Sequence, residues 1–208
     1  MKLHDSIGPN PRLVRFFLAE KNLKLDLVQV DLMGGENRAG PYKQKNPAGQ
    51  TPCLELEDGT FLAETVPICE YIDELHPEPV LIGTTAQERA LTRMWTRRIE
   101  YKITIPLADG FRFAEGLPLF KSRIHTIPQA ANDLKAIARE GLAWLDAEIQ
   151  GRPFIAGSRF TLADILLFSF LEFGATVGQP LDPALANLKA WYARVQTRPT
   201  VAATQHGA

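Results

Sequence analysis

The residues most capable of chemistry in this chain are two dipeptides that flank an expected hairpin, Thr51-Pro52 and Glu64-Thr65. Pro52 enters an apolar segment. A cis bond before it would free the Thr51 backbone to pair with an extended ligand. Thr65 opens an expected helix, whose unpaired N–H groups and positive dipole attract a carboxylate. Together the two pairs predict a pocket for a short anionic peptide.

The elements that must position these pairs lie in the first 75 residues, where strand and helix patterns alternate. Strand patterns cover residues 2–5, 25–30, 53–56 and 61–63. Helix patterns cover 12–21 and 66–75, with a weak helical turn at 42–45. The tetrapeptide Glu57-Asp58-Gly59-Thr60 is typical of a hairpin turn. This order predicts a small mixed sheet with helices packed against it.

The pattern changes after a stiff linker, His76-Pro77-Glu78-Pro79. Helices are predicted over residues 86–114, 128–149, 165–173 and 183–196, with a kink at Pro106. The helix at 183–196 is expected to be the last one. Thr161 and Asp164 predict an N-capping box before the third helix. The expected domains are therefore residues 1–76, a linker at 77–85, and an all-helical domain at 86–208.

The composition of the 208 residues excludes several classes of function. A net charge of −1 with 45% hydrophobic residues is ordinary for a soluble protein. The chain has no basic stripe, no long apolar run and no secretory leader pattern, so we expect no nucleic acid, no membrane span and a cytoplasmic location. The scattered histidines predict no metal site. Cys53 and Cys69 are expected to be small buried side chains, with a redox pair as the alternative.

Three segments of the chain, taken in order, resemble the cytosolic glutathione transferase superfamily. They are residues 11–21, 46–68 and 160–164. The resemblance covers essentially the whole chain, and the loop Gly8-Pro9-Asn10-Pro11 is similar to the Gly-Pro-x-Pro loop of bacterial and fungal members. It implies an α+β N-terminal domain with a thioredoxin-like fold, followed by an all-α helical-bundle domain. It further implies a homodimeric detoxification enzyme that conjugates glutathione thiolate to apolar electrophilic small molecules.

The resemblance also implies roles for the polar residues around the pocket. Glu64 and Thr65 would hold the ammonium and the carboxylate of the γ-glutamyl end of glutathione. Thr51, beside Pro52, would pair its main chain with the cysteinyl unit. A simpler interpretation makes Thr65 a helix cap and Glu64 a solvated acid of the first turn.

Gln50 and Asn37 match the positions that reach the glycine carboxylate of glutathione in the family. Many relatives have a histidine where this chain has Asn37, and the asparagine keeps a donor but loses the possible charge. Both residues could instead be ordinary polar side chains of loops.

The group that activates the thiol is where this chain departs from the family. Most relatives use Tyr, Ser or Cys in the first loop, but that position falls near Gly8 here. Ser6 is one candidate, although it could simply end the first strand with a local turn bond. Asn10 is the second. We expect the thiol to lie near residues 6–10, with the helix dipole and water carrying most of the activation, as in some atypical members.

The electrophile is expected between the first loop and the helical domain. Its lining would be mostly apolar and include one arginine: Ile7, Tyr101, Ala108, Phe111 and Arg112. Such a lining suits an apolar molecule with a polar or anionic group, although Phe111 could equally be part of the core.

Two alternative functions remain. The bare first loop also suits a non-catalytic glutathione-binding module. A specialised glutathione-dependent isomerase or dehalogenase is the other alternative, but the Ser-Ser-Cys loop of maleylacetoacetate isomerases is missing. A Cys-dependent peroxidase or thiol reductase is disfavoured because no cysteine lies between Asp5 and Lys21.

Overall fold

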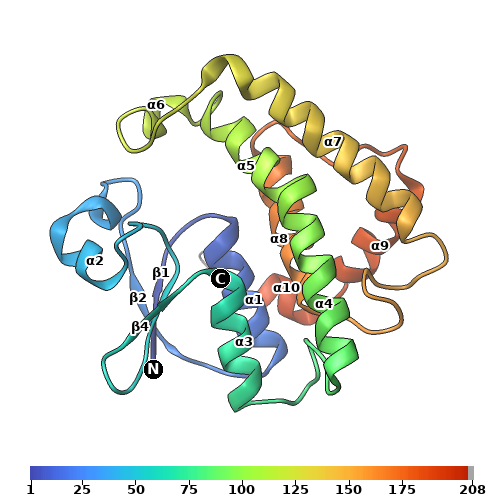
Figure 1. Ribbon diagram of the computed structural model, residues 1–208, viewed down its shortest axis with the longest axis horizontal. Coiled ribbons are helices and arrows are strands. Elements are labelled where there is room, and N and C mark those ends of the chain that lie inside the picture. The colour runs from blue at the N-terminus through green and yellow to red at the C-terminus, as the bar shows by residue number, and fades with distance from the viewer. Residues whose placement is uncertain (206–208) are drawn as a thin grey trace. The chain divides into compact units, whose positions relative to one another are not determined.

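The computed structural model describes residues 1–205 and divides into two compact units (Figure 1). The first unit comprises residues 1–80 and the C-terminal segment from Pro199, and the second comprises residues 81–198. The domain ranges 1–76, 77–85 and 86–208 stay predictions, and residues 206–208 lie outside the described part. The packing differs from those ranges in placing the C-terminal segment with the first unit.

The first unit is built on a four-stranded mixed sheet in the order β2-β1-β3-β4. Its strands are β1 (Lys2–Asp5), β2 (Asp26–Gln29), β3 (Cys53–Glu55) and β4 (Phe61–Ala63). β1 and β2 are parallel and the other two pairs are antiparallel. The helices are α1 (Pro9–Glu20), η1 (Glu36–Arg38), α2 (Gly40–Lys45) and α3 (Thr65–Leu75). The predicted thioredoxin-like arrangement is confirmed.

Alternation along the strands gives the sheet two different faces. Leu3 and Leu54 are paired across β1 and β3 and are fully buried. Their neighbours His4 and Cys53 point to the opposite face, since successive side chains of a strand alternate. On that face the His4 ring lies 6.3 Å from the ring of Tyr42, which belongs to α2. α2 therefore covers the His4 face.

The second unit is entirely helical, as predicted. It contains α4 (Ala86–Ile99), the π-helical turn η2 (Glu100–Thr104), α5 (Ile105–Arg112), α6 (Leu117–Phe120), η3 (Pro128–Ala130), α7 (Ala131–Glu148), α8 (Leu162–Thr176) and α9 (Ala186–Gln196). α8 is buried around nearly its whole circumference and forms the centre of the unit. No helix within residues 1–205 is long and apolar enough to cross a membrane.

The predicted helix over 86–114 is interrupted at Pro106. Because Pro106 has no N–H, it cannot donate to the Lys102 carbonyl one turn earlier. The Ile105 N–H bonds to the Glu100 carbonyl instead, which forms the π turn. α7 packs closely against this turn at Gly141, where an added Cβ would lie 2.3 Å from the Lys102 carbonyl oxygen. The expected kink is therefore a π turn that accommodates a neighbouring helix.

A short helix at the C-terminus was not predicted. α10 (Pro199–Ala203) follows α9, so the prediction that residues 183–196 form the last helix was wrong. Five residues are too few for a stable isolated helix, and α10 is held by packing against α1.

Asp164 links three parts of the second unit. Its fully buried carboxylate accepts hydrogen bonds from the Thr161 N–H and hydroxyl at 2.9 and 3.0 Å. The Ile155 N–H donates at 3.0 Å, and the indole N–H of Trp191 in α9 donates at 2.8 Å. Burial raises the pKa of Asp164 to about 6, although all these donors act in the opposite direction. The predicted capping interaction at the start of α8 is thus also a tie to α9.

Replacing this carboxylate with an amide should destabilise the second unit. In Asp164→Asn an NH2 group faces at least one buried donor, so we expect the free energy of unfolding to fall by about 2 kcal/mol at pH 7. Urea unfolding followed by circular dichroism measures this loss. An unchanged midpoint would show that the buried tie contributes nothing.

The same pair of proteins tests the raised pKa. An unfolded aspartate titrates near pH ~3.9, so the unfolded chain releases its proton first as the pH rises. This group should therefore reduce the stability of the native protein between about pH 4 and pH 6. The stability difference between the native protein and Asp164→Asn should shrink across that window, and a difference that grows would contradict the raised pKa.

Candidate active site

Three segments of the chain meet at one edge of the sheet because of the way β3 pairs. His4 at the end of β1 lies opposite Cys53, and Cys53 lies opposite Ala63 at the end of β4. The residues just before β3 and just after β4 are therefore neighbours. The loop that follows β1 and leads into α1 begins at the same edge.

A pocket occupies this edge. Its lining combines side chains from α1, the loop before β3 and the start of α3: Asn10, Asn46, Gln50, Thr51, Pro52, Glu64 and Thr65. The structure therefore brings together six of the residues predicted from the sequence, and Asn46 is an addition. Glu64 is the one formally charged side chain among the seven.

The start of α3 presents unpaired donors to the pocket. The first helical hydrogen bond runs from the Ile68 N–H to the Glu64 carbonyl, and Pro67 has no N–H. The N–H groups of Thr65 and Val66 precede that bond, and within the described residues no side chain caps this terminus. A carboxylate fits these donors and the positive end of the helix dipole.

Glu64 has a strained backbone, with φ 69° and ψ 130°. A non-glycine residue rarely adopts a positive φ, and such strain is concentrated at functional sites. Its exposed carboxylate lies next to the anion-accepting helix terminus. The combination of a negative side chain and a positive helix end suits the ammonium and carboxylate of an α-amino acid.

Thr51 presents its backbone to the same pocket. The Thr51–Pro52 bond is cis, as the sequence suggested. Within residues 1–205 neither the N–H nor the carbonyl of Thr51 has a backbone partner, although its side chain is largely buried. These two groups can pair with the main chain of an extended peptide.

Two side chains hold the loop in front of Thr51. The carbonyl of Gln50 accepts from the Tyr42 hydroxyl at 2.7 Å and from the Asn46 amide at 2.9 Å. Asn46 also accepts from the Ala48 N–H at 3.1 Å. Burial raises the pKa of the Tyr42 phenol, which therefore stays a donor. The sequence analysis missed both supports, although an Asn-Pro dipeptide is a known turn signal.

Asn37 uses one of its two amide N–H groups inside the unit. Its side chain is buried, and its amide N–H donates to the Gly49 carbonyl at 2.7 Å. Its remaining polar atom, Oδ1, is buried and has no partner within residues 1–205. Because Oδ1 is an acceptor, it would repel a carboxylate. The second N–H of the amide is not engaged in that bond, so the contact between Asn37 and the glycine end of a peptide stays a prediction.

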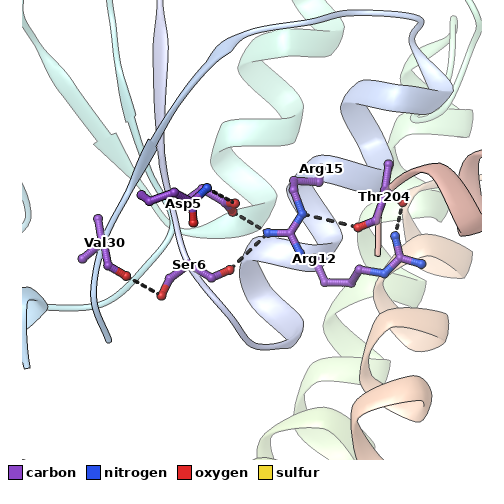
Figure 2. Close-up of polar contacts among 7 residues, drawn as sticks. Asp5, Ser6, Arg12, Arg15, Val30 and Thr204 are labelled. Atoms are coloured by element: carbon purple, nitrogen blue, oxygen red, sulfur yellow. Dashed lines mark hydrogen bonds and ion pairs between the residues drawn. The ribbon is translucent and has the colours of Figure 1, made fainter. Parts of the chain in front are cut away.

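The two candidates for thiol activation lie in different surroundings. Ser6 is buried, and its hydroxyl donates to the Val30 carbonyl at 2.8 Å (Figure 2). Asn10 is the second residue of α1 and lines the pocket. Pro9 and Pro11 on either side of it have no N–H. Among the first three residues of α1, Asn10 therefore has the one backbone N–H, and the residue lines the pocket.

Gly8 is the residue nearest to the position that the family resemblance assigns to an activating hydroxyl or thiol. Its φ of 110° is one that other residues rarely adopt, although an added Cβ would meet no neighbouring atom. The conformation of the backbone, rather than a lack of space, disfavours a side chain there.

The residues predicted to line an electrophile site are only partly gathered. In the second unit the ring of Phe111 lies edge-on to Phe173 at 5.1 Å and to Phe120 at 6.0 Å. Arg112 forms an ion pair with Asp109 at 2.8 Å. Ala108 is buried, whereas Tyr101 is exposed on η2 under the guanidinium of Arg97. Ile7, in the first unit, is partly exposed.

The two cysteines are unsuited to redox chemistry. Cys53 and Cys69 are unpaired and fully buried, which confirms the prediction of two small buried side chains. Burial raises the pKa of Cys53 to about 11 and raises that of Cys69 well above its usual value. Both remain protonated and unreactive near neutral pH. Within the described residues, no three metal-ligating side chains form a cluster.

Models of two protein families match the chain. The family described as "Glutathione S-transferase, N-terminal domain" matches residues 3–80, and "Glutathione S-transferase, C-terminal domain" matches residues 128–194. The two matched segments together cover most of the chain and fall in different compact units.

Relatives of known name and structure match the chain over nearly its whole length. Glutathione S-transferase 2 of Saccharomyces cerevisiae is 35% identical, over 97% of this chain and 88% of the relative. Glutathione S-transferase GstA of Escherichia coli O157:H7 is 31% identical, over 97% of this chain and 95% of the relative. The crystal structure of Gtt2 from Saccharomyces cerevisiae superposes with a TM-score of 0.92 at 34% identity, covering 99% of this chain and 100% of the other.

Proposed function

This chain belongs to the glutathione S-transferase family, and we propose a specific role for each residue of its pocket. The protein is an enzyme that conjugates glutathione. The observation that carries the assignment of roles is the meeting of a donor-rich helix terminus, an adjacent carboxylate and an unpaired stretch of backbone in one pocket. These are the partners that a zwitterionic γ-glutamyl group and the following peptide unit require.

Glutathione binds with its γ-glutamyl end at the start of α3. The carboxylate receives the N–H groups of Thr65 and Val66 and the Thr65 hydroxyl, and Glu64 pairs with the ammonium. The N–H and carbonyl of Thr51 pair with the cysteinyl unit. Gln50, whose carbonyl is held by Tyr42 and Asn46, has an exposed side chain that can reach the glycine carboxylate.

The thiol then lies at the first turn of α1. A thiol with a pKa near ~8.5 is mostly protonated at neutral pH, so its anion must be stabilised. Asn10 supplies a backbone N–H, a side-chain amide and the positive end of the helix dipole. Ser6 is not part of this step, because its hydroxyl is engaged with Val30 inside the unit. Water supplies the remaining hydrogen bonds to the sulfur.

The electrophile binds against the aromatic cluster of the second unit. The edge-on rings of Phe111, Phe120 and Phe173 form an apolar surface, and Arg112 lies 5.7 Å above the Phe120 ring. Such a surface suits an apolar molecule with a polar or anionic substituent. Tyr101, in the same unit, is exposed and can complete the lining.

The protein acts as a cytoplasmic homodimer in detoxification. Two unpaired cysteines suit a reducing compartment. The exposed apolar side chains Leu91 and Ile105, of α4 and α5, are available for a subunit interface. Sedimentation velocity at micromolar concentration tests this assembly, and a monomer would refute it.

The non-catalytic binding module and the isomerase or dehalogenase are not favoured, because the relatives compared above are named transferases.

Removing polar groups at the start of α3 should weaken binding of glutathione. We expect Thr65→Val and Glu64→Gln each to raise the Kd about tenfold, because each loses a charge-assisted hydrogen bond. Isothermal calorimetry measures the Kd. Thr60 is exposed in the turn between β3 and β4, away from the pocket. Thr60→Val is therefore the matched control and should bind glutathione with the native Kd. Unchanged affinity in both pocket variants would contradict the assigned orientation.

Negative charge at the first turn of α1 should raise the pKa of the bound glutathione thiol. In Asn10→Asp a carboxylate lies beside the sulfur, so the pKa of bound glutathione should rise by about one unit and turnover at pH 6.5 should fall roughly tenfold. The measurement is the pH dependence of kcat/KM with a chloronitrobenzene electrophile. Asn132→Asp, exposed on α7, introduces the same charge elsewhere as a control.

Ser6→Ala separates the two candidates for activation. The variant loses one buried hydrogen bond, so stability should fall by about 1 kcal/mol while most of the turnover remains. A loss of turnover by orders of magnitude would instead make Ser6 the activating group and overturn the role of Asn10.

Truncation of Phe111 should affect the electrophile rather than glutathione. We expect Phe111→Ala to raise the KM for the chloronitrobenzene about three- to tenfold, through loss of aromatic contact area, and to leave the KM for glutathione unchanged. Equal effects on both constants would show that the ring cluster supports the fold rather than the electrophile.

A further inference from the structure

The C-terminal segment packs against the first two turns of α1 through two arginines. The guanidinium of Arg12 donates to the Thr204 hydroxyl and, at 2.9 Å, to the Val201 carbonyl. Arg15, almost one turn further along α1, donates from Nε to the Thr204 carbonyl at 3.4 Å. Thr204 thus accepts from both arginines, one through its side chain and one through its backbone (Figure 2).

Arg15 also reaches the other end of the first loop. Its Nη1 donates to the Ser6 carbonyl at 3.1 Å and to the Asp5 carboxylate at 2.5 Å. Asp5 accepts a second bond from the Gln29 amide at 3.2 Å. The side chain of Arg15 therefore lies between Ser6 and Thr204, as Figure 2 shows.

These contacts are shielded from water. Asp5 and Ser6 are 1% and 2% exposed, Arg12 is 7% exposed and Thr204 is 9% exposed. Water cannot readily replace a lost partner at such sites, so each bond restricts the groups that it joins. The positions of Ser6 and of the first turn of α1 are therefore coupled to Thr204.

The restricted groups are the two ends of the loop that leads to Asn10. Ser6 is held from one side by the Val30 carbonyl and from the other by Arg15. Arg12, two residues after Asn10, is held by the C-terminal segment. Residues 7–11 connect these fixed points, and Asn10, one of them, lines the pocket.

We infer that Thr204 and Arg15 are positioning residues for the conjugation reaction: they fix the loop that places Asn10 against the glutathione thiol. The inference rests on the proposed role of Asn10. A reacting group must be placed to within a fraction of an ångström, and a displacement of about 1 Å can cost up to 100-fold in rate. A residue close to the C-terminus would thus act on chemistry at the N-terminal loop.

The main test compares Thr204→Val with Thr204→Ser. Valine keeps the shape of the side chain but removes the acceptor for Arg12, whereas serine retains the hydroxyl. We expect Thr204→Val to lower kcat about three- to tenfold at pH 6.5 and to raise the pH midpoint of kcat/KM by about half a unit to one unit. The Kd of S-methylglutathione, which has no thiol, should change less than about twofold because the α3 end is untouched. Thr204→Ser should match the native enzyme.

A second substitution in the same segment distinguishes positioning from simple anchoring. Thr200 of α10 donates to Glu20 at the far end of α1. Thr200→Val therefore loosens the same helix away from the first loop. We expect both Thr200→Val and Thr204→Val to lower the melting temperature, but Thr200→Val should leave the pH midpoint at the native value. The inference is overturned if Thr204→Val shifts only the melting temperature, or if both variants shift the pH midpoint equally.

Arg15→Lys provides the same test if Thr204→Val does not fold. Lysine keeps a charge for Asp5 but cannot bridge the Ser6 and Thr204 carbonyls at once. The expected result is again a fall in kcat and a higher pH midpoint with unchanged binding of S-methylglutathione. An unchanged midpoint would overturn the inference. Failure of the native protein to bind S-methylglutathione or to turn over would instead refute the proposed function, so the two failures are distinguishable.

Discussion

The antiparallel pairing of β3 with its two neighbours is the constraint on which the pocket depends. Because His4, Cys53 and Ala63 lie across from one another, three loops far apart in the sequence begin or end at one edge of the sheet. A shift of one residue in either pairing would turn every side chain of the strand to the other face and separate these loops. Leu3 and Leu54 resist such a shift, since both are completely buried on the face opposite α2.

Two helices, α3 and α1, begin at this edge with different numbers of free backbone N–H groups. At α3, Pro67 removes one N–H but leaves those of Thr65 and Val66, which suits the two oxygens of a carboxylate. At α1, Pro9 and Pro11 leave a single N–H at Asn10, which suits one sulfur atom. The prolines thus limit competing hydrogen bonds while the helix dipoles favour negative charge at both places. In the roles proposed above, prolines suit one terminus to a carboxylate and the other to a thiolate.

Most of the fold could be predicted because its signals are local. Alternating strands, the Asp-Gly turn and the pair Thr161 and Asp164 each specify structure over a few residues. The errors occur where neighbouring elements decide. The expected kink at Pro106 is a π turn against which α7 packs at Gly141, and α10 is too short to form without α1. Neither packing partner is visible in a window of adjacent residues.

The sequence by itself determined the family, the two kinds of domain and most of the residues that line the pocket, because these rest on motifs whose chemistry is carried by adjacent side chains. Tertiary structure decided how individual polar groups are used. The hydroxyl of Ser6 donates to the Val30 carbonyl, and one N–H of the Asn37 amide donates to the Gly49 carbonyl. Arg15 looked like one residue of a helix and proved to join the first loop to Thr204. Hydrogen bonds between distant segments are satisfied only when the chain is folded, so their partners could not be predicted from spacing alone.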